Sequence, residues 1–102
     1  MFGAVTAGRL PGETITNEKG TNLQYNVCSD IFAIERRRAP ACKKPRAIQT
    51  AIIGETRRLN FGRMMQWHER WTVDRCGGAV VYLIHFDFRG SVGRYKIEPP
   101  KA

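Results

Sequence analysis

Hydrophobic and polar residues alternate most clearly in two segments of the second half of the chain. In Met65–Asp74 the odd-numbered positions are mostly apolar, and in Ala79–Phe88 every even-numbered position is apolar. A period of two places such residues on one face of a β-strand. The pattern therefore predicts two long strands that each bury one face. The residues of these faces are Met65, Trp67, Trp71 and Val73 in the first strand and Val80, Tyr82, Ile84, Phe86 and Phe88 in the second.

The segment Arg75–Gly78 predicts a hairpin between these strands. A two-residue turn at Cys76-Gly77 and a four-residue loop over Arg75–Gly78 give the same register. A slip of one residue would bury charged side chains, so the apolar faces specify this register. Aromatic pairs across strands stabilise a sheet by ~0.2–1 kcal/mol each. The predicted pairs are Trp67 with Phe86, Trp71 with Tyr82 and Val73 with Val80.

Two further strands are expected around this hairpin. Ala47–Gly54 is typical of a strand ended by glycine, and Glu55–Gly62 is typical of a polar connection. Arg94–Glu98 places Tyr95 and Ile97 on one face, and the prolines that follow it prevent further pairing. We therefore expect a three-stranded meander at the end of the chain, with the Ala47–Ile53 strand nearby.

The first half of the chain has weaker patterns. Residues 1–21 are rich in Gly, Thr, Pro and Asn and indicate an arm or loop, with room for a short strand near Glu13–Thr16. Apolar and polar residues alternate in Asn22–Val27, which predicts a half-buried strand. Ser29 and Asp30 are good helix N-caps, so Ile31–Glu35 fits one helical turn or a continued strand. Arg36–Arg46 contains two prolines and is expected to be an exposed loop.

These elements predict a mainly β fold, or an α+β fold with one short helix, built on a small antiparallel sheet. The domain organisation expected is an N-terminal arm or loop over residues 1–21 and a single β-rich domain over residues 22–102. A chain of 102 residues with 42% apolar and 25% charged residues is long enough for one core and too apolar for a disordered tail. No apolar run approaches the roughly 20 residues of a membrane-spanning helix, so we expect no transmembrane segment.

Charge narrows the class of partner. The net charge of +8 favours anionic partners such as an acidic protein, an acidic ligand or nucleic acid. For the basic segment Arg36–Arg46, the alternative to an anion-binding site is a solvated loop whose charges keep an edge strand from aggregating. For nucleic acid, Tyr25, Phe32 or Tyr95 could supply base stacking. The candidate anion-binding or partner-binding residues are Arg36, Arg37, Arg38, Lys43, Lys44 and Arg46.

The three cysteines bear on the cellular compartment. In an exported protein two of them should pair, whereas in a cytosolic protein they would be free thiols. Cys42 precedes one predicted strand and Cys76 lies at the hairpin turn, so the preferred bridge is Cys42 to Cys76, with the role of Cys28 open. That bridge would close a loop of about 35 residues and contribute ~3–4 kcal/mol in the chain-entropy model. A nucleophilic cysteine has no evident histidine and carboxylate partners.

The predicted register sets His68 opposite His85 on the less apolar face. Two facing imidazoles could bind a metal ion or titrate together near neutral pH. Structural metal sites usually have three or four ligands, and neither Cys-x-x-Cys nor His-x-x-x-His occurs in the chain. The favoured interpretation is two half-exposed histidines with no metal or cofactor. Glu69 falls on the aromatic face, where a buried arginine or the wet rim of the sheet would accommodate it.

The run Trp67-His68-Glu69-Arg70-Trp71-Thr72-Val73-Asp74-Arg75-Cys76-Gly77 resembles a Trp-x-Glu-x-Trp-x-Val-x-x-Cys-Gly segment of small uncharacterised proteobacterial proteins, which are often exported or lipid-anchored. The resemblance covers about a tenth of the chain in specific residues. It implies an envelope location and a disulfide that uses Cys76, and it brings no known activity. The start of the chain lacks the features of a secretion signal, so we expect such a signal to be absent or already removed.

Two functions follow from these observations. The first is a non-enzymatic accessory or binding domain of the bacterial envelope or secreted fraction, which engages a partner through its sheet and its basic loop. The alternative is an intracellular nucleic-acid-binding module that uses the Arg36–Arg46 loop. An enzyme whose site assembles from scattered residues is a third and weaker reading. A disulfide would indicate a periplasmic or secreted protein, and free thiols a cytoplasmic one.

Overall fold

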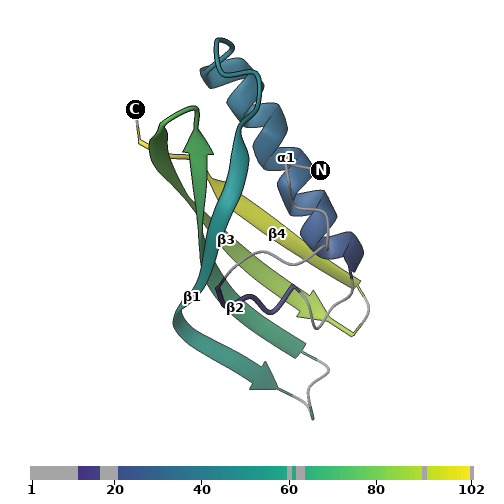
Figure 1. Cartoon of the computed structure of the whole chain (residues 1–102). Helices are drawn as coiled ribbons and strands as arrows, with labels where there is room; N and C mark the ends of the chain where they lie inside the picture. The colour runs from purple at the N-terminus through teal and green to yellow at the C-terminus, as the bar shows by residue number, and fades with distance from the viewer. Residues whose placement is uncertain (1–11, 17–20, 60, 62–63, 91, 102) are drawn as a thin grey trace.

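One helix and four strands make up the fold. The computed structural model describes residues 12–16, 21–59, 61, 64–90 and 92–101 (Figure 1). The strands form one antiparallel sheet in the order β1-β2-β3-β4, so each strand lies beside its neighbour in the sequence. The predicted mainly β class, with a sheet that ends in a three-stranded meander, is confirmed. The elements are α1 (Thr21–Arg38), β1 (Arg46–Leu59), β2 (Met64–Arg75), β3 (Gly78–Arg89) and β4 (Val92–Glu98).

The hairpin of β2 and β3 has the predicted register. Trp67 pairs with Phe86, and the same ladder pairs Trp71 with Tyr82, Val73 with Val80 and His68 with His85. The turn has two residues, because Arg75 pairs directly with Gly78. Both turn residues have positive φ, 51° at Cys76 and 104° at Gly77, as a tight hairpin turn of primed type requires.

The core lies between α1 and one face of the sheet (Figure 1). The indole ring of Trp67 stacks on Phe86 with centroids 4.5 Å apart and an interplanar angle of 6°. Burial of such large apolar side chains is the main favourable contribution to folding. The buried apolar residues are Ile15, Leu23, Val27, Cys28, Ile31, Ala47, Met65, Trp67, Trp71, Val73, Tyr82, Ile84 and Phe86.

Helix α1 replaces the strand predicted over Asn22–Val27, and that prediction is wrong. At Ile31–Glu35 the helical alternative is confirmed and the continued strand is wrong, although the helix is longer than the single turn expected. Leu23, Val27 and Ile31 lie four residues apart and are all buried, which is the spacing of one helix face. Tyr25, which shared a face with Leu23 and Val27 in the strand interpretation, is 53% exposed.

The basic segment is only partly a loop. Arg36, Arg37 and Arg38 form the last turn of α1, where cations interact favourably with the helix dipole. The connection to β1 therefore starts at Ala39, and the backbone N–H of Ala39 still donates to the carbonyl of Glu35 at 2.8 Å. The prediction of an exposed loop is wrong for the three arginines, for Pro45, which is buried, and for Arg46, which begins β1. It is correct for residues 40, 41, 43 and 44, which are exposed.

Strand β1 continues beyond the glycine that was expected to end it. Its pairing with β2 shifts between Ile53 and Arg57, and Gly54 within this bulge has a φ of 65°. A β-bulge absorbs extra residues and bends the strand without ending it. The first part of the predicted Glu55–Gly62 connection is therefore strand, which extends to Leu59.

Part of the N-terminal arm packs against the sheet. Ile15 is 4% exposed and Thr16 is fully buried. Gly12 forms an isolated parallel bridge with Thr50, and the N–H of Glu13 donates to the Thr50 carbonyl at 3.1 Å. The short strand expected near Glu13–Thr16 is therefore a single bridge at Gly12. Residues 1–11 and 17–20 of the expected arm lie outside the described residues.

Within the described part of the chain, no helix has both the length and the apolar character needed to span a membrane.

Candidate functional site

The six candidate basic residues come together at one end of the molecule, which we call the basic end. It consists of Arg36, Arg37 and Arg38 in the last turn of α1 and Lys43, Lys44 and Arg46 before and in β1. All six side chains are exposed. Arg46 has an ion-pair distance of 3.7 Å to Asp74, and the Arg36 guanidinium lies 5.8 Å from the ring centroid of Phe32. For Arg37, Lys43 and Lys44 the described residues provide no ion pair.

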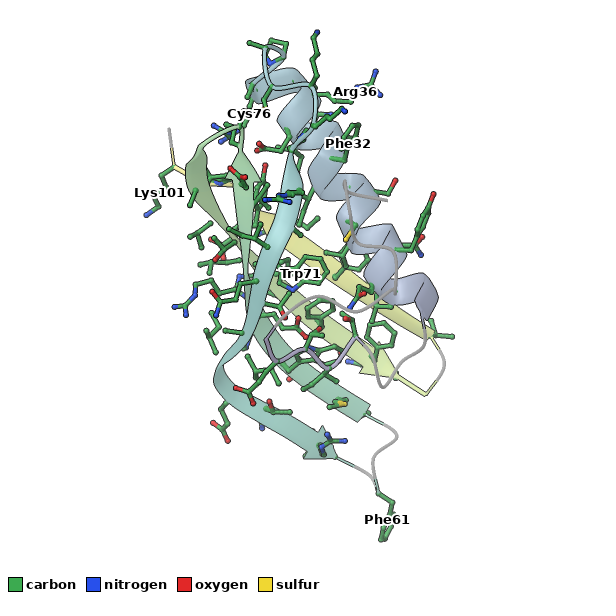
Figure 2. All side chains as sticks on the ribbon, in the orientation of Figure 1. Phe32, Arg36, Phe61, Trp71, Cys76 and Lys101 are labelled. Carbon is green, nitrogen blue, oxygen red and sulfur yellow. A yellow bond between two sulfur atoms is a disulfide. The ribbon has the colours of Figure 1, made fainter. Side chains whose placement is uncertain are left out.

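A disulfide joins the basic end to the hairpin turn. Cys42, in the connection between α1 and β1, is bonded to Cys76, and their Cα atoms lie 5.6 Å apart. Figure 2 shows Arg36 and Cys76 at the same end of the molecule, far from Phe61. The predicted bridge is present, and it holds the connection that carries Lys43 and Lys44 against the sheet.

A buried polar cluster that the sequence interpretation missed lies beside this disulfide. The guanidinium of Arg75 donates two hydrogen bonds to the carboxylate of Glu35, at 2.8 and 2.6 Å, and the hydroxyl of Tyr82 donates a third at 2.5 Å. Glu35 is only 1% exposed. The cluster fixes the C-terminal part of α1 to β2 and β3.

The charges in this cluster shift its pKa values in consistent directions. The hydrogen bonds from Arg75 hold the pKa of Glu35 below its ordinary value, and the same contact raises the pKa of Arg75. Burial, together with the hydrogen bond to Glu35, raises the pKa of Tyr82. Glu35 and Arg75 are therefore a charged pair at neutral pH, and their role is to hold α1 against the sheet.

The aromatic residues considered for base stacking are not available at the basic end. Phe32 packs against the core. Tyr95 packs against Phe86 and donates its hydroxyl hydrogen to Asp30 at 2.5 Å. Tyr25 is exposed, but it lies eleven positions before Arg36 in α1, a rise of about 16 Å along a helix. The basic end therefore offers charge to a partner without a stacking platform.

The two histidines face each other on the side of the sheet away from α1, which we call the outer face. The Nδ1 atoms of His68 and His85 are 2.7 Å apart, and the Nε2 atom of His85 hydrogen-bonds the carboxylate of Glu98 from β4. This contact with His85 lowers the pKa of Glu98. Three groups from three neighbouring strands are thus joined in series, and the contribution of Glu98 was not predicted.

The geometry of the histidine pair favours a shared hydrogen over a metal ion. The ring centroids lie 4.9 Å apart, so the two nitrogens face each other nearly head-on. Two nitrogens bound to one tetrahedral zinc at about 2.0 Å each lie about 3.3 Å apart, whereas these two are 2.7 Å apart and face each other. Among the described residues, no three His, Cys, Asp or Glu side chains are placed to hold a metal ion.

An open groove of about 460 Å³ surrounds the histidine pair. Residues of all four strands line the groove. One carboxylate oxygen of Asp87 is buried and has no hydrogen-bond partner in the described structure. The groove is lined by Glu55, Arg57, Gln66, His68, His85, Phe86, Asp87, Arg94, Tyr95 and Lys96.

Two other groups that are capable of chemistry, the Glu69 carboxylate and the Cys28 thiol, are both buried. Glu69 is fully buried on the aromatic face, so the expectation that a buried arginine or the wet rim of the sheet accommodates it is wrong. Its partners are the indole nitrogens of Trp67 and Trp71, the hydroxyl of Thr14 and the backbone N–H of Ile15.

Cys28 is a free buried cysteine, and burial raises the pKa of its thiol to about 12. A thiol that stays protonated is a poor nucleophile.

Comparison with known protein families, with curated proteins and with solved structures finds no match for the chain.

Proposed function

We propose that the chain is a non-enzymatic binding domain of an oxidising compartment, the bacterial envelope or the outside of the cell, and that an acidic partner docks on its basic end. One observation carries the proposal: Cys42, in the middle of the basic segment, is bonded to Cys76 at the hairpin turn. Disulfides persist in oxidising compartments and are rare in the cytosol of most organisms. The bacterial part of the proposal rests on the resemblance of the Trp67–Gly77 segment.

The charge arrangement supports an acidic partner. Six exposed cations fall within eleven residues, and Asp74, the acidic group paired with Arg46, is half-buried. Glu35 is hydrogen-bonded to Arg75 and interacts with only Arg38 among the six cations, through a smaller electrostatic effect. A rigid patch of one sign speeds encounter with a partner of the other sign and fixes its orientation. Val81, 41% exposed on the outer face near the hairpin turn, adds apolar area beside the patch.

A nucleic acid is the alternative partner, and the local chemistry argues against it. Proteins that bind single strands combine cations with exposed aromatic rings, and Phe32 and Tyr95 are engaged elsewhere. Contacts to phosphates alone would give binding without sequence preference. The disulfide also favours a compartment in which nucleic acid is an unusual partner.

The test compares two charge-reversal variants of equal size. K43E/K44E changes the basic end, and R70E/R89E changes two exposed arginines of the outer face. Binding to poly-L-glutamate and to single-stranded and duplex oligonucleotides is measured at about 50 and 200 mM salt, because such contacts weaken steeply with salt. We expect K43E/K44E to weaken poly-L-glutamate binding about tenfold and R70E/R89E to weaken it less than about threefold.

Equal losses in the two variants would contradict a specific basic end and indicate attraction by net charge alone. Tighter binding to oligonucleotides than to poly-L-glutamate would favour the nucleic-acid alternative. Alkylation at the moment of lysis of the native host adds an independent test of compartment. Two protected cysteines agree with the proposal, and three reactive thiols contradict it.

A further inference from the structure

The hydrogen-bond series on the outer face has a direction. A carboxylate only accepts hydrogen bonds, so the Nε2 atom of His85 that contacts Glu98 carries a hydrogen. In a neutral imidazole the other nitrogen, Nδ1, is then an acceptor. His68 must therefore donate from its own Nδ1 across the 2.7 Å contact. The Nε2 atom of His68 is left with a lone pair, and no partner for it lies among the described residues.

This direction determines where the pair takes its first proton. A proton on Nε2 of His68 keeps both hydrogen bonds of the series, and the resulting positive charge is linked through His85 to the carboxylate of Glu98. A second proton, on Nδ1 of His85, would set two donors against each other and break the contact. The pair is therefore built to hold one extra proton. Whichever Nδ1 atom then carries the shared hydrogen, the Nε2 atom of His68 has become a donor.

The groove around the pair contains charges of both signs. Its cations come from Arg57 on β1 and from Arg94 and Lys96 on β4. Its acidic groups are Glu55 on β1 and Asp87 on β3, and Glu98, at the end of the hydrogen-bond series, also interacts with Lys96 and Lys101. Cations therefore outnumber acidic groups by one, and an added proton increases this excess.

The bulge in β1 keeps the Nε2 side of the His68 ring accessible. The Cδ2 atom of His68, next to Nε2 in the ring, lies 3.9 Å from the point where a Cβ on Gly54 would stand. Gly54 has no side chain, and its φ of 65° turns β1 so that Glu55 and Arg57 line the same groove. The outward nitrogen thus faces a space bordered by Arg57.

We propose that this groove binds a small oxyanion, with Arg57, Arg94 and Lys96 attracting it and His68 donating from Nε2 once the histidine pair has taken up a proton. Binding is stronger when the pair holds this extra proton. The shared chemistry is an oxygen anion, either the tetrahedral group of a sulfate or phosphate or the planar group of a carboxylate. This site is distinct from the basic end, which lies at the other end of the β2–β3 hairpin.

The experiment uses sulfate and acetate as probes, because the charge of neither changes between about pH 5.5 and 8. Binding is followed by the backbone amide signals of β2, β3 and β4 in NMR titrations at constant ionic strength. We expect at least about fivefold tighter binding at pH 5.5, the effect of one added charge near the anion in a solvent-exposed site. The probe that binds more tightly identifies the tetrahedral or the planar geometry.

Four variants make the test specific. H68Q/H85Q keeps hydrogen-bonding side chains at both positions without titration, and it should abolish the pH dependence. R94Q should weaken binding at both pH values, whereas R70Q, on the same face but outside the groove, should leave it unchanged. K43E/K44E should also bind as the unchanged protein does, which separates this proposal from the function of the basic end.

Four outcomes would overturn the proposal: no shifts with either probe, equal affinity at both pH values, a pH dependence that survives in H68Q/H85Q, or equal weakening in R94Q and R70Q. The substituted histidines and arginines lie on the outer face, and Lys43 and Lys44 are exposed at the basic end, so none of these side chains belongs to the buried aromatic core. The amide spectrum of each variant verifies that it is folded before the titration.

Discussion

Trp71 donates its indole hydrogen to Oε1 of Glu69 at 2.7 Å, although the two residues lie only two positions apart on the same face of β2. The carboxylate also accepts from Trp67 at 2.7 Å, from Thr14 at 2.7 Å and from the N–H of Ile15 at 2.9 Å. A buried carboxylate can thus be held by four neutral donors in place of a cation. Glu69 joins the N-terminal arm to the sheet.

Replacing this carboxylate should loosen the arm. E69Q removes the charge and turns one acceptor oxygen toward donors as an NH₂ group, so we expect a loss of about 2–4 kcal/mol in the free energy of unfolding. Urea unfolding measures the loss, with E55Q, an exposed residue of β1, as a control that should stay within about 0.5 kcal/mol. Faster hydrogen exchange at the amide of Ile15 is also expected, and an unchanged rate would contradict the anchoring role.

The disulfide should be a large part of the stability of so small a domain. The double variant C42S/C76S should lose about 3–4 kcal/mol in urea unfolding, because the bond closes a loop of 34 residues. Reductant should destabilise the unchanged protein and have no effect on the variant. Mass spectrometry after alkylation in denaturant, without reduction, should show one modified thiol, that of Cys28. Three modified thiols would rule out the bridge.

The Glu35 cluster predicts a loss of stability in acid. The pKa of Glu35 is lower in the folded protein than its ordinary value near 4.5, so the unfolded chain takes up the proton first. The contribution is therefore fully present above about pH 4.5 and is lost as the pH falls through the lower folded pKa. Glu98, whose pKa is also lowered, acts in the same direction.

Acid titrations of unfolding stability test this effect. E35Q should be less stable at pH 7 and should show a smaller drop between about pH 5 and 3 than the unchanged protein. Y82F, which removes one hydrogen bond and keeps the Arg75 pair, should lose only about 1 kcal/mol and keep most of the pH dependence. An E35Q profile parallel to that of the unchanged protein would contradict the role of Glu35.

Two glycines, Gly93 near the start of β4 and Gly78 at the start of β3, provide a test of packing. A Cβ at Gly93 would lie 2.3 Å from ring carbons of Phe88, and that ring packs against Trp67 at a centroid distance of 5.6 Å. G93A should therefore cost about 1–3 kcal/mol. Gly78 has open space at the same position, so G78A should change the thermal midpoint little. Equal midpoints for the two variants would show that Phe88 moves freely.

The sequence by itself was sufficient for the hairpin of β2 and β3. Each of its two strands has one face that is mostly apolar, and the strands are joined by a short turn, so a single register buries both apolar faces. The opposition of His68 and His85 followed from that register, and the bridge from Cys42 to Cys76 was predicted from the position of Cys42 before the Ala47 strand and of Cys76 at the turn. Local pattern alone did not determine α1, because Leu23 and Val27 fit both a period of two and a spacing of four.

The tertiary structure decided the rest, because it depends on contacts between distant segments. Helix α1 is the form in which Leu23, Val27 and Ile31 together cover the aromatic face of the sheet. Arg75 meets Glu35 across 40 positions, and Ile15 meets Glu69 across 54. Glu98 reaches His85 only through the pairing of β3 with β4. Such polar contacts leave no periodic trace in a sequence, since each pairs single residues that only the packing of α1, the arm and the sheet brings within hydrogen-bond distance.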